Sequence, residues 1–364
     1  MKPVLYSLLF TLLFAVSAVA LQPQGILTGA HGQERYLLKS CRACHRGMKM
    51  AIRNEEKSCL SCHGNSQNKR DMVTAGYLRD SGAAILLNIE EELQKSYRHP
   101  VLTENGIHQR KELLPENLVN AARHAECVDC HEPHKVSREK PFSGIQGKRV
   151  GSFVAEITKE YELCYKCHGR SANLPAGSTD KQQEFRLSNK SYHPVEGEGA
   201  NAHVISLKEP YAARKQRPGD ISIISCSDCH GSENPRSPRG PHGSNYRGLL
   251  KANYDTEDGR PESSFAYELC YQCHERSSIL GNESFPYHAL HILGDRGRDL
   301  TGTSCFTCHD AHGSQGTQYL IRFNTDVVET NLDGKLEYKA QGVATRHGSC
   351  ALRCHGVEHE PKNY

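Results

Sequence analysis

Regular alternation of apolar and polar positions is confined to a few short segments of this chain. A stripe of apolar residues at helical spacing over 85–93 predicts an amphipathic helix. Alternation over 319–323 and again over 336–340, after the Asp333-Gly334 turn, predicts a small β-hairpin near the C-terminus. Elsewhere, Gly-, Pro- and Asn-rich stretches predict loops. The expected fold is therefore mostly irregular and α, with short helices and long loops.

The first 20 residues have the pattern of a secretory signal. Lys2 is followed by an apolar run over 4–16 and by a small-x-small cleavage site at Ala18-Val19-Ala20. The run is shorter than the roughly 20 residues that a membrane-spanning helix needs. Residue 21 is leucine, so a lipidated cysteine is not expected at the new N-terminus. We expect an exported protein, periplasmic or extracellular, with no transmembrane segment after cleavage.

The composition leaves too little apolar material for an ordinary core. Hydrophobic residues make up 37% of the 364 positions, tryptophan is absent and the mean hydropathy is −0.63. The charged fraction of 24% does not indicate disorder. The 45 basic and 42 acidic residues nearly balance, so a nucleic-acid partner is not indicated. Something other than side chains is therefore expected to fill the interior.

All 16 cysteines fall into pairs, and a histidine follows every pair. The paired cysteines are Cys41 and Cys44, Cys59 and Cys62, Cys127 and Cys130, Cys164 and Cys167, Cys226 and Cys229, Cys270 and Cys273, Cys305 and Cys308, and Cys350 and Cys354. The histidines that follow are His45, His63, His131, His168, His230, His274, His309 and His355. Seven pairs have the CxxCH spacing of covalent haem c attachment, and the last is CxxxCH.

Disulfide frameworks and zinc ribbons also use paired cysteines, but neither requires the histidine. Histidine occupies about 6% of positions, so eight successive chance placements have a probability on the order of one in ten billion. On a helical turn the two thiols and the next side chain share one face, and the wider last spacing still keeps both sulfurs there. We therefore expect eight covalently attached haems, around which the loops wrap and which replace the missing core.

Thirteen further histidines can supply the second axial ligand of each iron, whereas methionines are few. His134 and His312 lie three residues beyond a motif histidine, so we expect each to ligate a neighbouring haem. His99 and His193 recur in the similar settings KSYRHPV and KSYHPV. The preferred set is His99, His124, His134, His193, His242, His288, His291 and His312. His31, His203 and His347 rank below it, and His108 and His359 come last.

The haem sites come two by two, and the second and third doublets repeat in detail. Each runs from an HPV histidine through a CxDCH site to YELCYKCH or YELCYQCH. The expected organisation is a signal at 1–20 and dihaem modules at 21–75, 76–180, 181–280 and 281–364.

Eight haems in so short a chain lie too close together to be insulated from one another, which predicts an electron-transfer protein without catalytic residues. The alternative is a multihaem reductase of a small nitrogen or sulfur compound, which needs one iron with an exchangeable position. Some such enzymes use a CxxCK site, and none occurs here. The expected partners are other redox proteins or extracellular electron acceptors.

The doubled CxxCH modules, with RHAECVDCHEPH at 123–134 and FPYHALHI at 285–292 before CFTCHDAHGS, resemble the multihaem cytochromes of metal-reducing bacteria. The last third, from HGSNYRGLL to CHGVEHEPKNY, is similar to the extracellular cytochromes that polymerise into conductive filaments. In that group a histidine of one subunit can ligate a haem of the next, so the resemblance implies that this chain can form a homopolymer, or nanowire. The alternative left open by the sequence is a discrete carrier in the periplasm.

Overall fold

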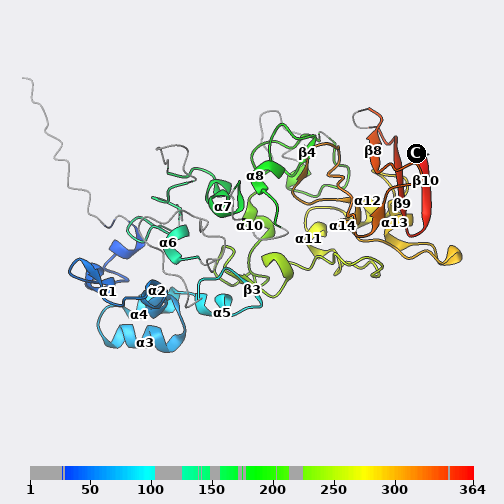
Figure 1. Ribbon diagram of the computed structural model, residues 1–364. Helices are drawn as coiled ribbons and strands as arrows, with labels where there is room; N and C mark the ends of the chain where they lie inside the picture. Colours follow the sequence, from blue (N-terminus) through cyan, green and yellow to red (C-terminus); the bar gives the residue numbers. More distant parts are fainter. Residues whose placement is uncertain are drawn as a thin grey trace, which may run out of the picture.

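The computed structural model describes residues 27, 29–102, 125–137, 139–140, 142–147, 156–170, 174, 178–201, 203–212, 224–342 and 345–364. The molecule is elongated, with helices α1 to α4 at one end and strands β8 to β10 at the other (Figure 1). The expected signal at 1–20, His108 and His124 lie outside the described residues. Within the described part, no helix combines the length and apolarity needed to cross a bilayer.

The helices are short, as the sequence predicts, and many of them carry the cysteines. They are η1 Ala30–Gly32, α1 Ser40–Cys44, α2 Glu55–His63, α3 Ser66–Thr74, α4 Asp80–Ile85, α5 Ile89–Leu93, α6 Cys127–Cys130, α7 Glu160–His168, α8 Lys181–Glu184, α10 Cys226–Cys229, η2 Arg247–Leu249, α11 Glu268–Tyr271, α12 Arg276–Leu280, α13 His288–Leu293, η3 Arg296–Arg298 and α14 Cys305–Cys308. Helices α1, α2, α6, α7, α10 and α14 each span both cysteines of one CxxCH motif, and α11 holds Cys270.

The prediction of one helix over 85–93 is wrong. Helix α4 ends at Ile85 and α5 begins only at Ile89. The side chain of Asn88 accepts a hydrogen bond from the backbone N–H of Glu90 at 3.1 Å, which caps the start of α5. An asparagine at this position therefore starts a second helix instead of continuing the first.

The strands form small antiparallel sheets. They are β1 His45–Arg46, β2 Lys49–Met50, β3 Tyr97–Arg98, β4 Ser191–Tyr192, β5 Gly243–Ser244, β6 Gly313–Ser314, β7 Val328–Glu329, β8 Glu337–Ala340, β9 Gly348–Cys354 and β10 Val357–Asn363. Strand β1 pairs with β2, β3 with β5 and β4 with β6, and the fourth sheet has the order β10-β9-β7 with β8 also on β9.

The predicted C-terminal hairpin is confirmed only in its second half. Residues 337–340 form β8, but its partner is β9 and not the segment 319–323. Tyr319 and Leu320 have φ values of 61° and 60°, so the chain turns there and cannot continue as a strand. The longest strands, β9 and β10, were not predicted.

Two of the small sheets connect distant parts of the chain. Tyr97 of β3 pairs with Ser244 of β5, and Tyr192 of β4 pairs with Gly313 of β6. In both cases the first strand immediately precedes an HPV segment and the second contains the Gly-Ser that follows a histidine. The same long-range connection is therefore made twice along the molecule.

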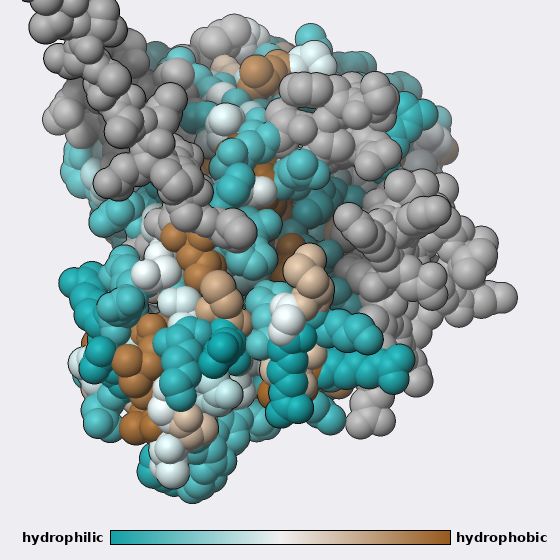
Figure 2. Space-filling view, turned by 90° about the vertical axis from the view of Figure 1, so that its left-hand side faces the viewer, coloured by the Kyte–Doolittle hydropathy of each residue, from teal (hydrophilic) through white to brown (hydrophobic). Residues whose placement is uncertain are grey.

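The side chains alone build only a small core. One buried cluster holds Ala266, Tyr267, Tyr271 and Ile292, and a second one is centred on Tyr165. Figure 2, a view onto the N-terminal end, shows hydrophobic residues exposed between mostly hydrophilic ones on the surface. This distribution agrees with a fold whose interior is completed by bound groups.

Candidate haem centres

Each CxxCH motif is shaped by its own local hydrogen bonds. At Cys127–Cys130, the backbone N–H of His131 donates to the carbonyl of Cys127 at 2.9 Å, and Asp129 accepts from the N–H of Glu126 at 2.7 Å. The backbone of His131 is then extended, with φ −128°. The helical turn keeps the two thiols on one side, and at this motif the change to extended backbone directs the histidine away from the helix. His63 and His168, in contrast, are the last residues of α2 and α7.

Most of the histidines face one another in pairs, at nearly one distance. The ring centroids are 6.1 Å apart for His31 and His63 and for His45 and His134, 6.2 Å for His99 and His168 and for His131 and His242, and 6.4 Å for His230 and His312, for His288 and His309 and for His291 and His359. His193 lies close enough to His274 to lower the pKa of that imidazole, after the larger effect of burial.

This spacing is that of two imidazoles bound to one metal ion. Metal–imidazole bonds are about 2.0–2.1 Å long and a ring centroid lies about 1.1 Å behind its nitrogen, so trans ligands have centroids about 6.3 Å apart. The described residues therefore fit iron centres with two histidine ligands.

Six of the measured pairs join a motif histidine to a second histidine from elsewhere in the chain. His134 faces His45 and His312 faces His230, so neither lies opposite the motif histidine three residues before it. His355 faces no histidine among the described residues and lies 3.0 Å from the Asp258 carboxylate. His203 is exposed.

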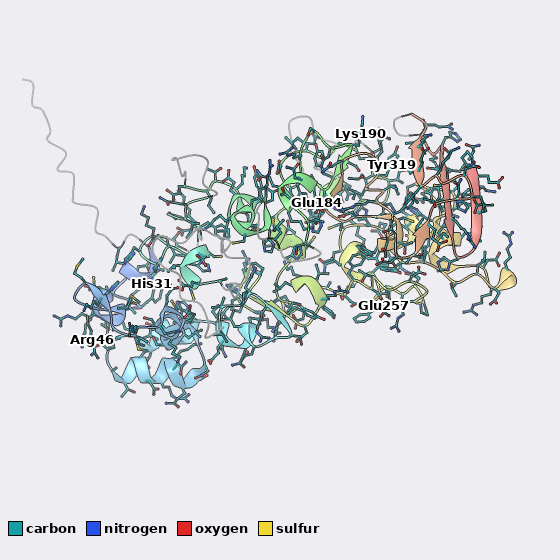
Figure 3. The ribbon with its side chains drawn as sticks, viewed as in Figure 1. His31, Arg46, Glu184, Lys190, Glu257 and Tyr319 are labelled. Carbon is teal, nitrogen blue, oxygen red and sulfur yellow. The ribbon has the colours of Figure 1, made fainter. Side chains whose placement is uncertain are left out.

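Two of the paired histidines, His31 and His359, are not in the set of second ligands that the sequence favours. His31 lies at the N-terminal end of the molecule (Figure 3), opposite His63. The repeat of Ala30-His31-Gly32 in Ala311-His312-Gly313 is a sequence signal that could have raised its rank. His359 lies on β10 and faces His291 of α13, and no local motif indicates this pairing.

Three of the second histidines share one hydrogen bond that fixes their ring orientation. In each, Nδ1 donates to the carbonyl of the residue before another paired histidine: His31 to Pro133 at 2.7 Å, His99 to Pro241 at 2.6 Å and His193 to Ala311. A proton held at Nδ1 leaves the Nε2 lone pair for the metal. These bonds connect neighbouring haem sites through the backbone.

Burial keeps the imidazoles neutral, which is the form that binds a metal. Desolvation lowers the pKa of His63, His168, His242 and His274 to about 4, and that of His288 to about 3.

The thiols of consecutive motifs lie next to one another along the molecule. The neighbouring thiol and burial together raise the pKa of Cys127, Cys164 and Cys305, and the neighbours are Cys59, Cys226 and Cys270 respectively. Electrostatic interactions join Cys62 to Cys44, Cys164 to Cys130, Cys229 to Cys273 and Cys308 to Cys354. Every motif is thereby next to the one that follows it in the sequence.

Carboxylates stand at two of these junctions. Glu55 accepts a hydrogen bond from the N–H of Val128 at 3.0 Å, and its oxygen lies within 4.8 Å of the sulfurs of Cys59 and Cys127. Burial raises the pKa of Glu55 to about 7, and the nearby Glu126 adds to the effect. In the corresponding place, Glu160 accepts from the N–H and hydroxyl of Ser227 at 2.7 and 2.8 Å.

A cluster of charged side chains surrounds His312 near the middle of the elongated molecule, where Figure 3 labels Glu184. The carboxylate of Glu184 is buried and pairs with Lys181 at 2.7 Å and with Arg322 at 3.1 Å. Arg322 also pairs with Asp310 at 2.8 Å, and both Glu184 and Asp310 come within 3.4 Å of Nδ1 of His312. These contacts hold the imidazole from the side opposite its partner ring.

A family model described as a doubled CXXCH motif matches residues 120–173 and 222–278, which is less than half of the chain. The matched segments contain the motifs that begin at Cys127 and Cys164 and at Cys226 and Cys270. Comparisons with curated proteins and with solved structures give no match. The match supports a multihaem c-type cytochrome, and its CXXCH motifs indicate covalently bound haem c.

Proposed function

We propose that this chain is an octahaem electron-transfer cytochrome whose haems follow one another in the order of their motifs. The observation that carries the proposal is the proximity of consecutive motifs, such as the sulfurs of Cys59 and Cys127, which lie within 4.8 Å of each other. Haem c supplies one-electron chemistry, and its thioether sulfurs sit at the edge of the macrocycle. Adjacent sulfurs therefore bring consecutive redox groups edge to edge.

The protein's own contribution is to fix the positions of these groups and to close their coordination. Seven histidine pairs have the spacing of two ligands on one metal, and His193 lies close enough to His274 to lower its pKa. Two imidazoles on one iron leave no position for a substrate there and favour a low potential. This supports an electron carrier over the reductase alternative.

The setting of the carrier follows from the expected signal. After export, it would exchange electrons in the cell envelope or outside the cell with other redox proteins or extracellular acceptors. Six motif histidines face a second histidine of the same chain, so these sites do not require a ligand from a second subunit. This favours a discrete carrier over a filament joined by ligation in trans.

The test uses the purified, exported protein. The intact mass should exceed that of the polypeptide by eight haems, and the ferric spectrum should show only low-spin iron. A rapid pulse of reductant should reduce all eight haems without added substrate. A high-spin signal that shifts on addition of nitrite or hydroxylamine, with turnover of either, would instead favour the enzyme. Uniform fibres in material sheared from cells would count against the discrete carrier.

A further inference from the structure

The first haem motif carries its histidine on a short hairpin. Strand β1 begins at His45, directly after the attachment cysteines, and the chain returns as β2. In this antiparallel pair His45 lies opposite Met50, and Arg46 lies opposite Lys49. Directly opposed residues share a face, and successive residues of a strand alternate between faces. Arg46 and Lys49 therefore lie on the face opposite to that of His45, whose ring faces His134.

The surface around this hairpin is strongly basic. Residues 35–53 contain six lysines and arginines and no aspartate or glutamate. Five of the six are exposed and form what we call the N-terminal basic surface: Lys39, Arg42, Arg46, Lys49 and Arg53. In the described part of the chain, no ion pair joins any of the five to a carboxylate. Their charge is therefore available to a second molecule.

The rest of the molecule does not share this character. In the sheet at the other end, Lys339 lies 2.6 Å from Glu337 and Lys335 lies 3.7 Å from Asp333. Each ferric haem brings two propionates against one positive charge, so eight haems add about −8 to the formal +3 of the polypeptide. The protein with its haems is then acidic as a whole, and the N-terminal basic surface is a local exception.

The N-terminal basic surface also exposes apolar side chains and one edge of the first haem site. Met48, at the tip of the hairpin, is fully exposed, and Met50 and Ile52 are exposed as well. So is Cys41, through which the first haem is attached at the edge of the macrocycle. Figure 3 labels Arg46 at this end of the elongated molecule. Apolar groups beside a haem edge, surrounded by charge, have the anatomy of a small electron-transfer interface.

We propose that the N-terminal basic surface docks a small redox protein with an acidic face, which exchanges electrons with the haem at Cys41 and Cys44. The inference rests on the proposed function, because it needs a haem at the first motif. One electron leaves the reduced cofactor of the partner and converts one ferric iron to ferrous, and no bond forms or breaks. Anionic lipid would also attract these cations, but it has no electron to exchange with the exposed edge at Cys41.

The test measures how fast flavodoxin hydroquinone, an acidic FMN protein, reduces the fully oxidised cytochrome in stopped flow. Two proteins of the same overall charge repel each other, and salt screens that repulsion, so contact at random positions predicts a rate that rises with ionic strength. Docking at the N-terminal basic surface predicts the opposite. The rate should fall as the ionic strength rises from about 10 to about 200 mM. A rate that rises with salt would overturn the proposal.

The deciding variant combines Arg46→Glu with Lys49→Glu on the outer face of the hairpin. It should slow reduction by flavodoxin about tenfold at low salt and remove the fall of the rate with salt. The matched control combines Lys335→Glu with Lys339→Glu, which changes the net charge equally at the other end and should slow the reaction less than about twofold. Equal slowing in both variants, or none in the first, would refute the docking site.

Three further measurements separate the possible causes. A redox titration should give the same haem potentials in both variants and in the unaltered protein, and a shift in the Arg46→Glu/Lys49→Glu variant would instead place these cations on the propionates of the first haem. Binding to phosphatidylserine vesicles that this variant loses, with no change in its flavodoxin rate, would assign the surface to a membrane and overturn the proposal. If the variant does not carry eight haems by mass, the salt dependence of the unaltered protein decides.

Failure of the proposed function would look different. Dithionite, a small reductant, should reduce all eight haems of the unaltered protein whatever the state of the N-terminal basic surface. Fewer than eight haems, or haems that dithionite leaves oxidised, would contradict the octahaem carrier itself. Full reduction by dithionite together with a flavodoxin rate that rises with salt would refute the docking site alone.

Discussion

Replacing Glu55 by glutamine should flatten the pH dependence of stability. Burial raises the pKa of this carboxyl from 4.5 to about 7, so the folded protein holds the proton more tightly than the unfolded chain. The stabilisation from the protonated form is complete below about pH 4.5 and is lost as the pH rises to about 7. The full difference corresponds to about 3 kcal/mol. Because the side chain is only half-buried, screening by solvent reduces it to about 1–2 kcal/mol.

Guanidinium denaturation of the oxidised protein at pH 5 and pH 8 measures this difference. The unaltered protein should lose about 1–2 kcal/mol more than Glu55→Gln between the two values. The amide oxygen can still accept the hydrogen bond from Val128, so geometry is kept. Glu139→Gln, which changes an exposed glutamate, is the control and should follow the unaltered protein. Parallel pH profiles for Glu55→Gln and the unaltered protein would refute the reasoning.

Three further changes test other parts of the site. His242→Ala should turn one eighth of the iron high-spin by electron paramagnetic resonance, whereas the exposed His203→Ala should not. Arg322→Met removes one of the two cations that pair with the buried Glu184. It should lower the free energy of unfolding, measured by chemical denaturation, by about 1–2 kcal/mol. An unchanged value would contradict a structural role for this ion pair. Tyr267→Phe removes a buried hydroxyl without a partner among the described residues, so stability should stay equal or rise by about 1 kcal/mol, and a clear loss would reveal a bound water.

The sequence predicts well those parts of the site whose geometry is set by residues close together in the chain, namely the CxxCH motifs. Seven motifs carry their geometry within five residues, because a helical turn such as Cys226–Cys229 is closed by its own backbone and by Asp228. The spacing alone is then enough to indicate where haem c attaches. The same locality made the helical turns of these motifs predictable, whereas helices without cysteines, such as α3 and α12, were not predicted and the one expected over 85–93 is broken at Asn88.

The pairing of the histidines depends on contacts between segments that are distant in the sequence. The spacing of residues within a motif does not predict these contacts. The bond from His99 to Pro241 spans 142 residues, and that from His31 to Pro133 spans 102. The repeats indicated that His99 and His193 have one role, but they carried no information on the motif that each would face. Only the small sheets, such as β3 with β5, bring the two partners together.

The last motif shows why a pattern can identify an attachment site and still mislead on its structure. Cys350 and Cys354 are four residues apart. This spacing is close to one helical turn and is also a multiple of the two-residue period of a strand, so both sulfurs lie on one side in either structure. In a helix the next residue would be the natural ligand. In a strand the next residue points to the other face or enters the turn, as His355 does. The polar sequence of β10, which includes Pro361, does not predict a strand, so the register that places His359 opposite Leu352 could not be predicted either.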